Sequence, residues 1–238
     1  QTSQMTRILT SVVLLVLLIP SLALGETVKW DDLVEREGLL HKKFTDVPFS
    51  GTVTGKRQGK LKDGKKVGPW VRYHDNGKLF YKGVYKNGKA DGPWVFYRNY
   101  GQSWDKGTIK NGKRDGPWVS YGDNGLLSYK ETYKDGEREG PWVGYHDNGQ
   151  LLNKGTYKDG LKDGPWVSYW KNGKLGYKGT YKDGKEDGPY VEYHNNGQLS
   201  SKGTYKDGKR EGLWVHYRED GTGDNYSTGT YKNGKKVK

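Results

Sequence analysis

The chain of 238 residues contains no cysteine, which excludes disulfide bonds, thiol catalysis and cysteine-ligated zinc. Aliphatic side chains are scarce as well, because hydrophobic residues make up only 32% of the chain and the mean hydropathy is -1.03. Yet the 19 Tyr and 9 Trp are more aromatic residues than a disordered chain carries. This combination predicts a thin structure whose side chains stack in a row instead of filling a deep core.

The residue patterns of an enzyme are absent from the sequence too. It contains no GxGxxG motif, no P-loop and no nucleophile–base constellation. An acid does recur before a Gly-Pro corner, but a ladder of identical rungs lacks the difference in environment that separates a catalytic acid from a base. We therefore expect no enzymatic activity and no cofactor, and we expect these acids to pair with nearby lysines. They are Asp91, Asp115, Glu139, Asp163, Asp187 and Glu211.

A metal site is not expected either. His74, His146 and His194 share one position of a repeat, so neighbours in this set would lie about 29 and 19 Å apart on a sheet. Zinc needs ligand nitrogens at about 2.0–2.1 Å, and these three side chains could not share one ion.

The most informative pattern is a repeat. The phrase GPWVSY at residues 116–121 belongs to a set of seven copies at 24-residue intervals, with GPYVEY at 188 and GLWVHY at 212 as the most divergent. Each unit reads as a strand, a turn such as HDNG, a second strand such as QLLNKGTY, and a second turn, KDG or KNG. Asn-Gly and Asp-Gly are strong hairpin signals. The sequence therefore predicts an all-β fold, a single-layer antiparallel meander of tandem 24-residue β-hairpins.

Alternation along the strands predicts two faces. In the second strand, Leu151, Gly155 and Tyr157 share one face, and Lys154 and Lys158 share the other. In the first strand Val and Tyr share a face, so we expect Val, Tyr, Leu and the second Tyr to form the packed side. The freely varying residue between Val and Tyr is expected on the solvent side; it is Arg72, Phe96, Ser120, Gly144, Ser168, Glu192 or His216.

The tryptophans fall on the opposite parity, beside the Gly-Pro corner. Two arrangements are consistent with this position: the rings fold over the sheet and are sealed, or they line a binding groove. The second makes them a candidate binding ribbon. Its members are Trp70, Trp94, Trp118, Trp142, Trp166, Tyr190 and Trp214.

Lysines form a second ladder on a chain of net charge +13. Two positions per repeat place Lys on the same strand face about every 9.6 Å, which suits an anionic membrane surface or polysaccharide. The alternative is a solvated face that guards an exposed sheet. Nucleic acid is disfavoured as a partner of an exported protein. The two rows are Lys82, Lys106, Lys130, Lys154, Lys178 and Lys202, and Lys86, Lys110, Lys134, Lys158, Lys182 and Lys206.

The amino-terminal residues predict export. Residues 1–4 precede a plausible initiator, Met5, and are set aside as non-native or read-through residues. Residues 5–25 have the basic start, apolar run and small-residue end of a signal peptide cleaved near Gly25, which directs the chain to the periplasm or outside the cell. An uncleaved membrane anchor is the alternative, although the apolar run is shorter than the about 20 residues of a span.

The remaining chain divides into a capping segment, residues 26–58, and a repeat array, residues 59–238, with seven units after a leading half-unit. Within the cap, residues 30–37 suggest a short helical turn. Residues 39–55 suggest an extra hairpin that covers the first edge strand, which would otherwise invite aggregation.

The phrase GTYKDGLKDGPWVSYWKNG at 155–173 resembles the MORN repeat. More closely, the array is similar to the bacterial MORN-variant family called YwqK-like and often labelled antitoxin. The resemblance covers residues 44–236 and implies an open array of β-hairpins without enzymatic activity that contacts proteins or phospholipids. We therefore expect an exported scaffold that binds a protein through its aromatic ribbon. The alternatives are binding of an anionic membrane or envelope polymer through the lysines, and an antitoxin or immunity protein. The partner and the oligomeric state stay open.

Overall fold

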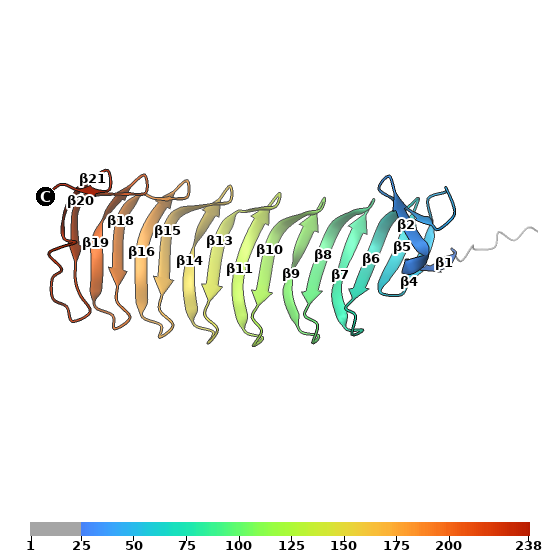
Figure 1. Ribbon diagram of the computed structural model, residues 1–238, viewed down its shortest axis with the longest axis horizontal. Coiled ribbons are helices and arrows are strands. Elements are labelled where there is room, and N and C mark those ends of the chain that lie inside the picture. Colours follow the sequence, from blue (N-terminus) through green and yellow to red (C-terminus); the bar gives the residue numbers. More distant parts are fainter. Residues whose placement is uncertain (1–24) are drawn as a thin grey trace, which may run out of the picture.

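The computed structural model describes residues 25–238. Residues 1–4 and the predicted signal segment, apart from Gly25, lie outside this part. One 3-10 turn, η1 (Trp30–Asp32), accompanies 22 strands, of which 20 form one sheet and two form a separate hairpin. Figure 1 shows the strands side by side in a long, single-layered ribbon with the cap at one end and the carboxyl terminus at the other. The predicted all-β, single-layer fold is confirmed.

The strands of the cap and of the array are as follows. The cap contains β1 (Thr27–Lys29), β2 (Leu33–Arg36), β3 (Leu39–Lys42) and β4 (Gly51–Thr54). The first half of the array contains β5 (Arg57–Lys62), β6 (Lys65–Tyr73), β7 (Leu79–Lys86), β8 (Lys89–Tyr97), β9 (Ser103–Lys110), β10 (Lys113–Tyr121), β11 (Leu127–Lys134), β12 (Glu137–Arg138) and β13 (Gly140–Tyr145). The second half contains β14 (Leu151–Lys158), β15 (Leu161–Tyr169), β16 (Leu175–Lys182), β17 (Lys185–Glu186), β18 (Gly188–Tyr193), β19 (Leu199–Lys206), β20 (Lys209–His216), β21 (Gly229–Lys232) and β22 (Lys235–Lys236).

Two kinds of tight turn make the array a meander. At the Asn-Gly and Asp-Gly turns both central residues have positive φ, as in Asn87 at 50° and Gly88 at 82°, which matches the two-residue turn whose twist suits a hairpin. At the opposite edge, the amide of His74 donates to the carbonyl of Lys78 at 2.7 Å across a turn that contains Gly77. Because both turns are tight, successive strand positions of the array pair antiparallel; β12 with β13, and β17 with β18, each make up one such position.

The cap departs from the meander. β1 pairs parallel with β4, and β2 pairs with β3 in the separate hairpin. The extra hairpin expected from residues 39–55 is reduced to one antiparallel bridge, between His41 and Pro48, because β3 pairs along its length with β2 and β4 joins the array through β5. The cap is fixed to the array by Lys66, whose ammonium lies 5.4 Å from the ring of Trp30 and 5.0 Å from that of Trp70.

A β-bulge at each Gly-Pro corner places the tryptophan. Asp115 of β10 pairs with Thr108 of β9, but the next pair is Trp118 with Gly107, so Gly116 and Pro117 have no opposite residue on this side. The bulge lays the indole over Gly107, where a Cβ atom would come within 2.4 Å of the ring. Gly107 is thus required by the close approach of the Trp118 ring.

This bulge corrects the predicted faces. Cross-strand partners share a face, and Val119 pairs with Lys106 and with Lys130, so Val lies on the lysine side of the sheet and not on the packed side. The repeated Tyr at position 121 also lies near Lys106, whose ammonium is 5.2 Å from its ring. The varying residue between them faces the tryptophans instead of solvent, and Ser120 is only 2% exposed.

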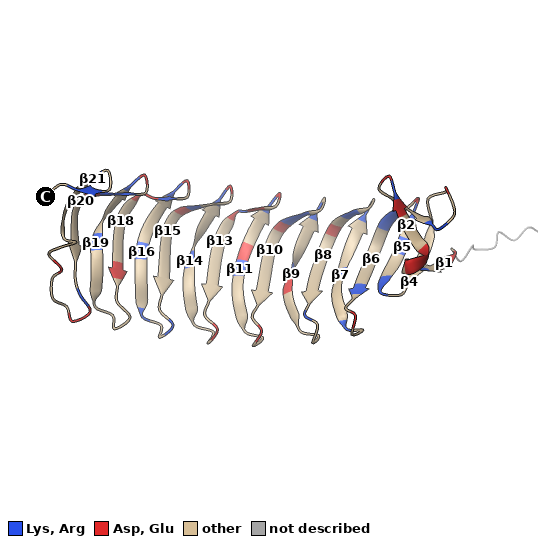
Figure 2. Cartoon of the chain, viewed as in Figure 1, with Lys and Arg blue, Asp and Glu red and all other residues tan. Residues whose placement is uncertain are grey.

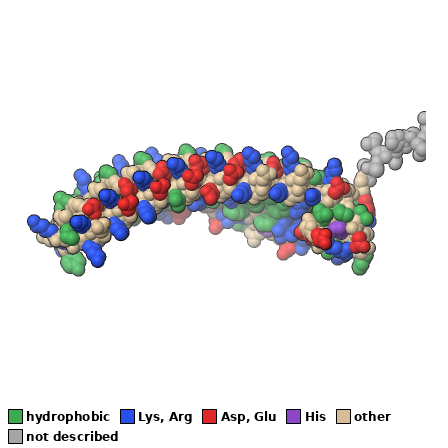
Figure 3. All heavy atoms as spheres, turned by 90° about the horizontal axis from the view of Figure 1, so that it is seen from above, with side chains coloured by type: hydrophobic (Ala, Val, Ile, Leu, Met, Phe, Trp, Pro, Cys, Tyr) green, Lys and Arg blue, Asp and Glu red, His purple; other side chains and the backbone are tan. Residues whose placement is uncertain are grey.

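We call the two sides the tryptophan face, which carries Trp118, Gly107 and Tyr133, and the lysine face, which carries Val119 and Lys106. Figure 3 shows the array as an arc, with hydrophobic side chains gathered in the hollow beside the cap. The cap itself packs on the tryptophan face, where its buried residues join those of the first strands of the array. This cluster contains Leu33, Leu40, Phe49, Val53, Leu61 and Trp70.

Candidate functional site

Most members of the candidate binding ribbon are sealed within the tryptophan face. Trp70, Trp118 and Trp166 are each 1% exposed, Trp214 is fully buried, and Trp94 is 5% exposed. Trp142 and Tyr190 are half-buried. The indole N–H usually bonds a carbonyl of the neighbouring strand: that of Trp118 donates to Thr108 at 3.0 Å. These rings form the interior of the layer and do not line a groove.

A row of cations covers the rings from the solvent side. The guanidinium of Arg114 lies 4.0 Å from the centre of the Trp118 ring and 5.3 Å from that of Tyr133. The same position, four residues before the aromatic ring, carries a cation over Trp and Tyr rings in five repeats, and such contacts stabilise partly desolvated charges. The covering cations are Lys66, Arg114, Arg138, Lys162 and Arg210. Sequence reasoning missed this row, although its 24-residue period was visible.

Ala90 interrupts the row of cations, so Trp94 has no covering charge, and further aromatic side chains gather around it. We call this region the aromatic patch, and its members are Phe80, Tyr81, Trp94, Phe96 and Trp104. Phe96 stacks on Trp94 at 5.6 Å between ring centres and lies 6.2 Å from Trp104. Phe80, Phe96 and Trp104 stay partly exposed, while Trp94 and Tyr81 form the buried floor.

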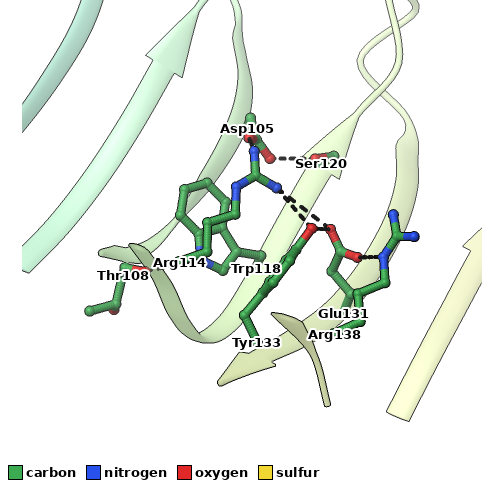
Figure 4. A network of polar contacts seen from close by, with 8 residues as sticks. All are labelled: Asp105, Thr108, Arg114, Trp118, Ser120, Glu131, Tyr133 and Arg138. Carbon is green, nitrogen blue, oxygen red and sulfur yellow. Dashed lines mark hydrogen bonds and ion pairs between the residues drawn. The ribbon is translucent and has the colours of Figure 1, made fainter. Parts of the chain in front are cut away.

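A polar cluster follows the aromatic patch along the tryptophan face (Figure 4). The side chains of Asp105 and Glu131 are 0% and 1% exposed. Arg114 contacts Asp105 at 2.6 Å and Glu131 at 3.7 Å, and Arg138 contacts Glu131 at 2.7 Å. The hydroxyl of Ser120 donates to Asp105 and that of Tyr133 to Glu131. Burial raises the pKa of the Asp105 carboxyl above its ordinary range, and burial likewise raises the pKa of Tyr133.

Glu131 stands where the other repeats have the glycine under the tryptophan. The ring of Trp142 therefore cannot take the usual seat; it stacks on Tyr129, with 5.1 Å between centres, and donates to the Asn153 side chain at 2.6 Å. The polar cluster neutralises both buried carboxylates with guanidinium groups. These ion pairs and hydrogen bonds have a structural role: they connect neighbouring strands in the middle of the array.

The predicted lysine ladder lies where alternation placed it. All twelve side chains are exposed on the lysine face, and among the ion pairs formed within residues 25–238 none involves a ladder lysine. Each lysine of the first row sits between two valines, as Lys154 does between Val143 and Val167. Figure 2 shows positive positions recurring on the strands along the whole array. The face combines unpaired positive charge with short apolar side chains.

We had expected the recurring acids to pair with lysines. Four of them instead accept hydrogen bonds from backbone amides of the turns. Glu139 accepts a hydrogen bond from the backbone amide of Asp159 at 2.9 Å, in the turn of the next repeat. Asp91, Asp187 and Glu211 accept equivalent bonds from turn amides. These carboxylates hold neighbouring turns together.

The three histidines at one repeat position connect the turns at the other edge. The Nε2 atoms of His74, His146 and His194 donate to carbonyl oxygens one repeat further on, at 2.8–2.9 Å. Arg98 and Trp170 take the same place in two other repeats and make equivalent bonds. This position therefore serves the spacing of the array.

The comparison with protein families agrees with this architecture. Residues 66–87, 138–159, 162–183 and 186–207 match the MORN repeat variant. Each MORN segment starts at the covering position before the ring and ends in the Asn-Gly or Asp-Gly turn, so it encloses one complete aromatic unit. The residues between the first two MORN segments include Ala90, Trp104 and Glu131, which carry the departures from the repeat. A search of curated proteins found no match.

Proposed function

We propose that the protein is a non-enzymatic MORN-like scaffold that binds a protein partner on its tryptophan face, at the aromatic patch. The observation that carries this proposal is the missing cation at Ala90. In five repeats a Lys or Arg covers the tryptophan four residues further on, whereas Trp94 has no such cation and its neighbours Phe96 and Trp104 lie partly exposed beside each other. Contiguous exposed aromatic side chains are characteristic of protein interfaces.

The rim of the aromatic patch indicates the chemistry of the partner. The guanidinium of Arg72 lies 5.0 Å from the ring of Phe80, and that of Arg98 lies 5.7 Å from the ring of Trp104. A partner that inserts an apolar side chain and places carboxylates next to it would complement both the rings and the two arginines.

Two substitutions test the site from opposite directions. Trp104→Ser removes an exposed ring, and Ala90→Arg restores the covering cation of the other repeats. Both should reduce partner recovery at least tenfold when residues 26–238 are used for quantitative affinity capture from an envelope extract. Leu152→Ser is the matched control, because Leu152 takes the place of Trp104 in a later repeat. Equal recovery of the same partner by all four proteins would refute the aromatic patch as the binding site.

The lysine face supports a second candidate function, binding of an extended polyanion. The observation that favours it is the twelve exposed ladder lysines, none of which forms an ion pair with another residue of 25–238. Each lysine near an anionic membrane contributes about 1 kcal/mol, so reversal of two charges should weaken binding at least tenfold. We expect salt-sensitive sedimentation with phosphatidylglycerol vesicles that is lost in Lys130→Glu/Lys154→Glu and kept in the cap variant Lys29→Glu/Lys43→Glu. Binding of an anionic polysaccharide instead would assign the face to an envelope polymer, and no binding to either at low salt would reject it.

Export is part of the same proposal and is supported by the signal-like residues 5–25. Expression of the full chain should yield a mature protein that begins at Glu26. Amino-terminal sequencing of the protein from separated cell fractions checks this expectation, and an uncleaved chain in the membrane fraction would favour the anchor.

A further inference from the structure

A second exception interrupts the row of covering cations, and it reverses the charge. Where five repeats have Lys or Arg, the repeat 186–207 has Glu186, and the ring beneath is Tyr190 in place of Trp. The covering residue and the ring beneath it thus both depart from the other repeats in this one repeat. Tyr190 stays half-buried, unlike the sealed indoles of Trp166 and Trp214 on either side.

Four tyrosines surround this position, and we call them, with Glu186, the tyrosine box. Tyr177 stacks on Tyr190 with 5.8 Å between ring centres, and Tyr205 meets Tyr190 edge-on at 5.3 Å. Tyr181 is the cross-strand partner of Glu186. The box offers the faces and edges of several rings close to one carboxylate.

A second carboxylate lies on the same face. Glu192 pairs across strands with Tyr177 and accepts a hydrogen bond from the hydroxyl of Ser201 at 3.1 Å. Burial raises the pKa of Glu186, and the hydrogen bond with Tyr181 and the charges of Lys162 and Arg210 offset only part of this rise. Burial also raises the pKa of Tyr190, so its phenol stays neutral at physiological pH and its ring keeps the electron-rich face that attracts cations.

The neighbouring cations lie over the rings of their own repeats, and Arg210 is also close enough to Tyr205 to oppose the rise that burial causes in the pKa of that tyrosine. The ammonium of Lys162 lies 4.4 Å from the ring of Trp166, and the guanidinium of Arg210 lies 4.6 Å from that of Trp214. Among the cation–π contacts within residues 25–238, none involves Tyr190 or Tyr205. Repulsion between these cations and a guest is limited, since equivalent positions lie about 9.6 Å apart, which is close to the Debye length in physiological salt.

We propose that the tyrosine box binds a cationic side chain, the ammonium or guanidinium group of a Lys or Arg that the docked protein partner presents. The guest takes the place that Lys162 or Arg210 takes in its own repeat, with Glu186 as its counter-ion and the rings as its walls. This inference rests on the proposed function, because the partner supplies the cation. It adds that the partner spans the face from an acidic, apolar segment at the aromatic patch to a basic residue four repeats away.

The test uses a probe in place of the unidentified partner. Residues 26–238 with fluorine-labelled tyrosine are titrated with acetyl-Gly-Arg-Gly-amide, and the fluorine NMR signals of Tyr190 and Tyr205 are assigned with Tyr→Phe variants. We expect these signals to shift and to saturate at millimolar peptide. The matching citrulline peptide, which is neutral and of the same shape, should cause no saturable shift.

Two variants make the result decisive. Glu186→Arg supplies the covering cation found in other repeats, so it should fold at least as well as the wild type, judged by its Tm, and lose peptide affinity at least tenfold. Glu219→Arg makes the same change of charge at an exposed turn and should bind normally. Equal binding of the citrulline peptide, or unchanged binding by Glu186→Arg, would overturn the proposal. Trp104→Ser should leave peptide binding intact, so a failure of the aromatic patch is distinguishable from a failure of the tyrosine box.

Discussion

Trp166 and Trp142 stand at the same position of the repeat, yet only one of them is sealed. Trp166 lies over Gly155, donates to the carbonyl of Thr156 at 3.2 Å and is covered by Lys162 at 4.4 Å. Trp142 meets Glu131 in place of the glycine and is half-buried. One Cβ atom on the neighbouring strand therefore decides whether the tryptophan becomes interior or stays at the surface.

The difference also shows how the array tolerates an irregular repeat. Glu131 removes a tryptophan from its seat, but its carboxylate gains Arg114, Arg138 and the Tyr133 hydroxyl. Since a buried charge is costly without partners, the cluster replaces packing with a satisfied polar network. The contact between the tryptophan and the neighbouring strand is thus made in two ways. We call the packing of Trp166 on Gly155 the regular seam and the polar network around Glu131 the irregular seam.

The largest expected effect comes from breaking the regular seam. In Gly155→Ala the new methyl group would come within 2.2 Å of the Trp166 ring, so the indole must leave its seat. Overpacking of this kind, together with lost burial of the indole, should lower the free energy of unfolding by about 3 kcal/mol. Urea unfolding followed by tryptophan fluorescence measures it. Gly223→Ala, where the nearest atom would be 3.8 Å away, should have little effect, and equal losses in both variants would refute the role of the seat.

An intermediate effect is expected from substitutions of Glu131 in the irregular seam. The order of their stability losses shows whether the charge or the space for the ring matters more. Glu131→Gln keeps the obstruction but removes the charge that Arg114 and Arg138 neutralise, which should cost about 2 kcal/mol. Glu131→Gly deletes the whole side chain and lets Trp142 return to the regular seat, so it should lie within about 1 kcal/mol of the wild type. Parallel urea titrations compare them. A larger loss for glycine than for glutamine would show that the polar network, not the seat, determines stability there.

The architecture was predictable because it depends on local chemistry. Asn-Gly and Asp-Gly turns adopt positive φ wherever they occur, and a 24-residue period then repeats the hairpin. The lysine ladder was also predictable, because the bulge of β14 lies at Leu152, before the ladder positions, and simple alternation holds from Lys154 to Lys158. Both inferences needed only neighbouring residues in the sequence.

The tryptophan face could not be read in the same way. The bulge at each Gly-Pro corner shifts the cross-strand register, so the glycine under Trp118 belongs to the preceding strand, and parity within one strand does not reveal it. The covering cation precedes the bulge and looks like part of a charged turn. The residue at position 120 varies among repeats because it fills different surroundings on the tryptophan face, as Phe96 and Glu192 illustrate, and not because it faces solvent.

The smallest expected effect concerns the repeat in which Glu186 replaces the covering cation of the other repeats. Burial raises the folded-state pKa of Glu186, so the folded protein binds this proton more tightly than the unfolded chain. The stability that this proton contributes is complete at low pH and is lost as the pH rises through the folded-state pKa. Glu186→Gln should therefore match the wild type near pH ~4 and exceed it slightly in Tm at neutral pH. Thermal unfolding across this range, with the exposed Glu219→Gln as control, measures the difference. A Tm of the wild type above that of Glu186→Gln at neutral pH, with the two values converging toward acid, would mean that Glu186 already has a stabilising partner, and that the tyrosine box has no place for a guest.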